Sequence, residues 1–147
     1  MTTREQLKKR LKRYRAIQRE RQHLQDEIER VEATLDGLRS PRWDGMPHGS
    51  GVSDPVLQAV ERYDALLGRH RAQEAELAAA LVEVETMIAS LDSPTERDLM
   101  RLKYINGLPW EEVCVAINYS WTRTHQIHGL VLDKLLERCG EEAQGDD

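Results

Sequence analysis

Length, composition and charge exclude several classes of protein at the outset. The 147 residues make about one domain, with 39% apolar, 32% charged and only 5% aromatic residues, which favours long solvated helices over one thick core. The longest uncharged apolar run, residues 77–82, is too short to cross a bilayer. No apolar stretch follows the charged N-terminus, so a secretory signal is not expected. The two cysteines fit a reducing cytoplasm rather than a disulfide framework.

The charge is unevenly placed along the chain. The net charge is −5, but residues 4–21 hold nine Lys or Arg against two Glu, whereas residues 93–138 hold six basic and six acidic residues. A solvated helix face is the usual meaning of such a basic run, and an arm that binds phosphates is the more specific one. Both interpretations stay open from the sequence.

A first helix is predicted for about residues 3–38. Its apolar positions recur at alternating steps of three and four, the pattern of a coiled-coil seam, with one irregular step near Tyr14 and a charged interruption at Arg21. The seam positions are Leu7, Leu11, Tyr14, Ile17, Arg21, Leu24, Ile28, Val31, Leu35 and Leu38.

A second helix is predicted for about residues 55–91. Pro, Gly, Ser and Asp dominate residues 40–55, which predicts a loop, and Asp54 followed by Pro55 is a helix start signal. The second seam is Val56, Val60, Tyr63, Leu67, His70, Glu74, Leu77, Leu81, Val84, Ile88 and Leu91. Alanines crowd residues 72–80, where another helix has room to approach, although alanine is also simply the best helix former.

Two long helices joined by one loop are expected to fold back as an antiparallel coiled-coil hairpin, residues 1–92, with its loop at about 39–54. Equal rise along both helices places Arg21 opposite Glu74, the charged interruptions of the two seams. The pair is expected to set the register more than the stability. Loss of one partner is expected to lower the free energy of unfolding by about 3 kcal/mol if the pair is buried, several times more than for a surface pair.

A compact unit of three helices is predicted for residues 93–138, followed by an acidic tail, residues 139–147. Ser93, Pro94 and Glu96 form a helix start signal, with the glutamate at the third helical position. Gly107 is expected to end the first helix in the left-handed conformation. The inward positions of the unit are Leu99, Leu102, Ile105, Val113, Cys114, Ile117, Thr124, Ile127, Val131, Leu132 and Leu135.

Residues 108–128 have the organisation of a helix-turn-helix: a short helix, a three-residue turn and a longer helix with a polar first turn. Cys114 is small enough for the helices to cross, Asn118 tolerates the positive φ that the turn needs, and Ser120 can cap the longer helix. Thr124 stands where an apolar residue is usual, and its hydroxyl is expected to donate to the Ser120 carbonyl one turn back.

No catalytic constellation is present in the sequence, so we expect no enzyme activity and no cofactor. His125 and His128 are three apart on a helix, but no third ligand has a convincing spacing, so no metal site is predicted. His70 is interpreted as a packed interruption of the second seam.

Residues 93–135 resemble the region-4 helix-turn-helix of bacterial sigma factors, and residues 5–136 resemble phage and prophage late-gene transcription regulators of the RinA/ArpU kind. The motifs that carry the resemblance are Tyr104-Ile105-Asn106-Gly107, Trp110-Glu111-Glu112-Val113, and Tyr119-Ser120 with His128 downstream. They follow the family order of a basic coiled-coil helix, a loop, a second long helix and a terminal helix-turn-helix. The resemblance implies a cytoplasmic protein of a bacterial host cell that binds double-stranded DNA near a promoter and activates late genes.

By the family pattern, the base-reading positions are Trp121, Thr122, Arg123, His125 and Gln126, although Trp121 can alternatively cover the core. The phosphate candidates are Ser120, Arg97, Arg101 and Lys103. A homodimer or higher homo-oligomer formed through the long helices is expected, because two copies can read two half-sites. Two alternatives stay open: a small-terminase-like packaging subunit that forms a ring, and a protein-binding scaffold that contacts RNA polymerase.

Overall fold

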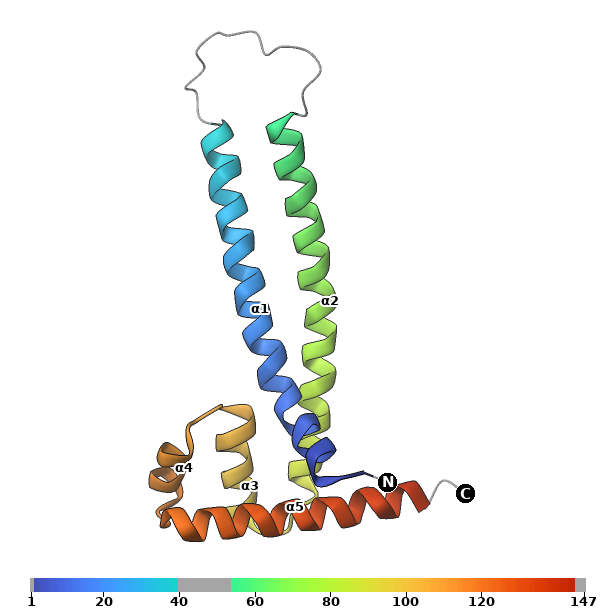
Figure 1. The fold of residues 1–147 in the computed structure, drawn as a ribbon, viewed down its shortest axis with the longest axis vertical. Coiled ribbons are helices and arrows are strands. Elements are labelled where there is room, and N and C mark those ends of the chain that lie inside the picture. Colours follow the sequence, from blue (N-terminus) through green and yellow to red (C-terminus); the bar gives the residue numbers. More distant parts are fainter. Residues whose placement is uncertain (1, 40–53, 145–147) are drawn as a thin grey trace. The chain divides into compact units, whose positions relative to one another are not determined.

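The computed structural model describes residues 2–39 and 54–144, and the elements in these ranges are helices (Figure 1). The predicted all-α fold is confirmed, with helices α1 (Arg4–Arg39) and α2 (Pro55–Ala89) packed against each other. Asp54 caps α2 as expected, because its Oδ1 accepts from the backbone N–H of Val56 at 3.0 Å. The rest of the predicted loop, residues 40–53, lies outside the described residues. None of the described helices is long and apolar enough to cross a membrane.

The chain forms two compact units, and they do not divide at residue 92 as predicted. One unit is residues 18–76, and the other joins residues 1–17 to residues 77–147. The first turns of α1 and the last turns of α2 therefore belong to the same unit as the C-terminal helices. The reason is a shared core, because Leu7 and Leu11 are buried in one cluster with Leu99 and Leu132.

The unit of residues 18–76 contains parts of both long helices, with Leu24, Ile28 and Leu66 at its core. The predicted contact of Arg21 with Glu74 is present, with Arg21 Nη2 3.8 Å from Glu74 Oε1. Because 67% of the Glu74 side chain is exposed, the pair is a surface pair and contributes at most about 1 kcal/mol.

His70 contacts the same arginine, since Arg21 Nε donates to His70 Nε2 at 3.3 Å. The histidine is therefore a packed interruption of the seam, as predicted.

The seam of α2 is wider than predicted. Leu66, Ala80 and Met87 are buried, and each stands one residue before a predicted seam position. At the end of the hairpin, Leu38 and Val56 are exposed by 43% and 37% although both were expected in the seam. An apolar face of three positions per heptad, rather than two, accounts for the extra residues.

The second unit contains α3 (Pro94–Met100), a π-helical turn η1 (Arg101–Ile105), α4 (Trp110–Ile117) and α5 (Trp121–Gln144). The predicted start of α3 is confirmed, because Ser93 Oγ accepts from Glu96 N at 3.4 Å. The Glu96 carboxylate, however, binds Lys134 Nζ at 2.6 Å. Helix α5 continues to Gln144, so most of the predicted acidic tail is helical, and residues 145–147 lie outside the described residues.

The π-helical turn changes which side chains face the core before α4. Leu102 and Ile105 are only half-buried, whereas Met100 and Tyr104 are 0% and 3% exposed. The wider turn rotates the residues from Arg101 onward, so Tyr104 rather than Ile105 is buried, whereas Met100 is buried at the end of α3 before the turn begins. Gly107 then ends the segment with φ +71°, in the left-handed conformation that was predicted.

Candidate nucleic-acid interface

The turn between α4 and α5 has the geometry that the sequence predicts. Cys114 is buried where the helices meet, and Asn118 adopts φ 60° and ψ 44°, in the left-handed region. Its neighbour Tyr119 donates its N–H to the Cys114 carbonyl at 3.1 Å, which closes the end of α4. Ser120 Oγ accepts from Arg123 N at 3.1 Å and caps α5. The capped start of α5 therefore follows α4 after a tight turn, as in a helix-turn-helix.

Thr124 occupies the inner side of α5 and is fully buried. The expected hydrogen bond of its hydroxyl to the Ser120 carbonyl is not formed, and within the described residues this hydroxyl has no partner. The Ser120 carbonyl instead accepts the backbone N–H of Thr124 at 2.9 Å.

The first turns of α5 carry an exposed polar face. Thr122, Arg123 and Gln126 are all exposed, and Arg123 Nη1 donates to Gln126 Oε1 at 3.5 Å. Trp121 is 51% exposed, so it does not cover the core. Arg and Gln are the side chains that can make paired hydrogen bonds to guanine and adenine edges in the major groove.

His125 differs from the other four predicted base-reading residues because its ring is packed. Its centroid lies 4.6 Å from the ring of Trp110 and 4.4 Å from the ring of Trp121. Its Nε2 atom is buried and has no hydrogen-bond partner in the described part of the chain. His125 is therefore half-buried between two tryptophan rings and does not belong to the exposed face of Thr122, Arg123 and Gln126, contrary to its prediction as a base-reading residue.

His128 joins α5 to the π-helical turn, a contact that sequence reasoning missed. Its Nε2 lies 2.7 Å from the Tyr104 hydroxyl, and its ring packs edge-on against Trp110 with centroids 4.7 Å apart. Burial, together with the electrostatic effect of Lys8, His125, Arg4 and Lys103, lowers the pKa of His128 to about 4. The neutral ring is the form that this site accommodates.

The depressed pKa of His128 predicts that the protein loses stability in acid. In the unfolded chain the ring takes a proton near its ordinary pKa of 6.5, whereas in the folded chain it does so only at about 4. The stabilisation of the folded chain by neutral His128 is therefore complete above pH 6.5 and declines as the pH falls toward 4. After discounting for solvent screening, we expect a loss of about 2 kcal/mol in the free energy of unfolding.

Urea unfolding at about pH 7 and about pH 4.5 measures this loss, with His128→Gln as the comparison. Glutamine cannot take the proton, so the variant is expected to lose less stability than the wild type over the same interval. Equal losses in the two proteins would show that His128 does not cause the acid sensitivity.

The predicted phosphate-binding residues differ in the contacts that their side chains already make within the fold. Arg97 Nη1 donates to the Leu91 carbonyl at 2.6 Å and to the Asp92 carbonyl at 3.1 Å, so it caps the segment after α2. Lys103 Nζ lies 4.9 Å above the Trp110 ring and donates to the Leu108 carbonyl at 3.3 Å. Arg101 is exposed and lies 4.0 Å from Asp98.

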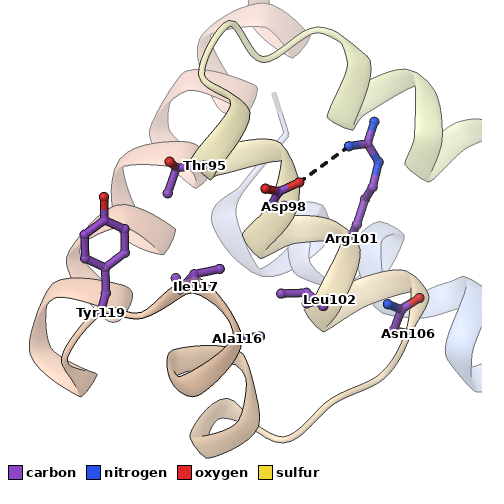
Figure 2. Close-up of a pocket in the computed structure, with 8 residues that line it drawn as sticks. All are labelled: Thr95, Asp98, Arg101, Leu102, Asn106, Ala116, Ile117 and Tyr119. Carbon is purple, nitrogen blue, oxygen red and sulfur yellow. Dashed lines mark ion pairs between the residues drawn. The ribbon is translucent and has the colours of Figure 1, made fainter.

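A cleft of about 520 Å³ lies between the α3–η1 segment and α4 (Figure 2). Leu102 and Ile117 point toward each other inside it, and the Asp98–Arg101 pair lies at one side (Figure 2). Val115 and Tyr119 on α4 and the following turn are 81% and 43% exposed. The remaining lining residues are Thr95, Asn106 and Ala116.

The comparisons with known proteins leave the family open: no family model, curated protein or solved structure matches the chain. In the part of the chain that the structure describes, no three His, Cys, Asp or Glu side chains come together as metal ligands would. The two cysteines, Cys114 and Cys139, are not joined to each other. The helix-turn-helix geometry is therefore the arrangement on which a functional proposal rests.

The basic start of α1 belongs to the same unit as this helix-turn-helix, which the sequence did not indicate. Arg4 Nη2 donates to the Gly129 carbonyl of α5 at 3.4 Å, and Arg15 packs against Gly107. Residues 4–15 carry seven Lys or Arg and one Glu. They add positive charge to residues 93–138, where basic and acidic residues balance.

Proposed function

We propose that the chain is a DNA-binding regulator of transcription in which the first turns of α5 read bases in the major groove. The observation that carries the proposal is the Ser120-capped helix with exposed Thr122, Arg123 and Gln126, placed after a turn with Asn118 in the left-handed conformation. The capped N-terminus also presents backbone N–H groups to a phosphate. The resemblance to RinA/ArpU regulators suggests late phage or prophage genes, as targets of activation.

Retention of double-stranded DNA by the purified chain at low salt tests this proposal. Positive residues of α1 and α5 are expected to give measurable binding that weakens as salt is raised. No retention of any DNA at low salt would contradict the proposal and favour the protein-binding scaffold.

The scaffold is the second candidate because of the cleft beside α4. The cleft holds Leu102 and Ile117 among polar lining residues, and the exposed side chains of Val115 and Tyr119 are of the kind that protein partners cover. A contact with RNA polymerase at this cleft is compatible with DNA binding through α5, since the two use different residues.

We further propose a dimer formed through α2. A stripe of small residues with steps of three and four runs along its exposed side, here called the small-residue stripe: Ala65, Gly68, Ala72, Ala75, Ala79, Val82, Thr86 and Ala89. These positions are symmetric about Leu77, so an antiparallel second copy places Ala75 opposite Ala79. The same register sets Arg69 opposite Glu85 of the second copy, and both side chains are exposed.

Light scattering is expected to give about twice the chain mass of 16.9 kDa. Ala79→Glu places like charges in the stripe and is expected to shift the protein toward the monomer, whereas Ala33→Glu, at an exposed site on α1, is expected to leave the dimer intact. A monomer at high concentration, with and without DNA, would overturn the dimer. A large ring would favour the packaging subunit.

A further inference from the structure

Three cations of α1 follow one another at steps of four residues, so they lie on one face of the helix. Arg4 is fixed to α5 through its hydrogen bond to the Gly129 carbonyl, and Lys8 and Lys12 follow on the next two turns. Gly129 shares a face of α5 with Thr122 and Gln126, because the steps between them are four and three. The start of α1 therefore lies beside the face of α5 that is proposed to read bases.

Lys103 extends this group of charges from the π-helical turn. Burial lowers the pKa of Lys103, the nearby charge of Lys12 lowers it further, and Glu111 opposes the change. Lys8 and Arg4 act in the same direction on the pKa of His128. Lys12 therefore lies close enough to Lys103 to act on its charge, and Arg4, Lys8 and Lys103 all lie near His128.

The described ion pairs do not account for this grouping of cations. Within the described residues, none of Arg4, Lys8, Lys12 and Lys103 forms an ion pair with an acid, whereas the neighbouring Arg10 binds Glu83 at 2.5 Å. Arg4 and Lys12 are exposed. Lys103 gives one hydrogen bond to the Leu108 carbonyl and has further donors available.

We propose that Arg4, Lys8, Lys12 and Lys103 form a basic ridge that binds the phosphate backbone of double-stranded DNA while the first turns of α5 enter the groove. The helix α1 is then part of the DNA interface and not only one half of a hairpin. This inference rests on the proposed function. Contacts of this kind carry no sequence information, so they fix the position of the protein and add affinity for every sequence alike.

The test is a binding titration of the full chain at several salt concentrations, on the selected sequence and on a scrambled one. The variant Lys8→Gln with Lys12→Gln removes two phosphate contacts. It is expected to lower the slope of log affinity against log salt by about 2 and the affinity for both sequences by on the order of tenfold. The control, Arg19→Gln with Arg30→Gln, removes two exposed charges from the part of α1 in the other unit and is expected to keep the wild-type slope.

Circular dichroism checks that both double variants fold, and the removal of repelling charges gives no reason for a loss of stability. An unchanged slope and affinity in the Lys8/Lys12 variant would overturn the basic ridge and leave DNA binding by α5 standing. Equal losses in the control variant would also overturn it, because the effect would then follow net charge alone. A wild-type chain that binds no DNA would overturn both proposals.

Discussion

Replacing Leu11 by alanine is expected to lower the free energy of unfolding of the C-terminal unit by about 2–5 kcal/mol, although Leu11 is more than 80 residues away in sequence from α3. The side chain is 0% exposed and belongs to the same core cluster as Val84, Val131 and Leu132. Truncation leaves a cavity that the surrounding helices fill only in part. Hydrogen exchange of the α5 amides measures the effect where it is expected.

Leu38→Ala is the matched control, because Leu38 lies on the same predicted seam of α1 but is 43% exposed. Its change in the free energy of unfolding is expected to stay within about 0.5 kcal/mol. Unchanged α5 protection in Leu11→Ala would mean that residues 93–144 fold without α1, as the predicted domain boundary implied.

That boundary could not be derived from the sequence because periodicity identifies a buried face but not its partner. The seam that contains Leu7, Leu11 and Ile17 has the same period whether these residues pack on α2 alone or on α5 as well. The antiparallel register was derivable, since one loop joins two helices with equal rise per residue, and it placed Arg21 near Glu74. Periodicity did not predict that Glu74 is exposed while Leu66, one residue before a predicted seam position, is buried.

The candidate site was predictable where the chemistry is local. Positive φ at Asn118 and Gly107 and the cap at Ser120 depend on a few neighbouring residues. The contact of Tyr104 with His128 was not predictable, because it depends on a π-helical turn that no simple period indicates.

The packed ring of His125 was missed for the same reason: its neighbours include Trp110 from another helix. Steps of three and four place His125 on one side of α5, but they do not show which aromatic ring packs there.

Replacing Arg123 by alanine is expected to weaken specific DNA binding by about 1–3 kcal/mol and to relax the preference at one base position. Arg123 is exposed on the first turn of α5, where its guanidinium can bind the two acceptors of a guanine edge, and Gln126 lies beside it at 3.5 Å. Binding titrations of the selected sequence and of single-base variants of it measure both effects.

Arg123→Lys separates base reading from phosphate binding. Lysine keeps the positive charge but loses the planar fork, so the preference is expected to relax while the salt dependence stays close to that of the wild type. If Arg123→Ala leaves specific binding untouched in a folded protein, α5 does not read bases through this residue, and the scaffold candidate gains support.

The central claim is that α5 reads DNA sequence, and selection from a random DNA pool tests it most directly. The purified chain is mixed with the pool, and the fragments that it retains are sequenced over several rounds. Enrichment of one motif, present as two half-sites about one helical turn apart or a multiple of it, is the result that a DNA-reading dimer predicts. Retained fragments with the same composition as the input pool would contradict sequence reading by α5.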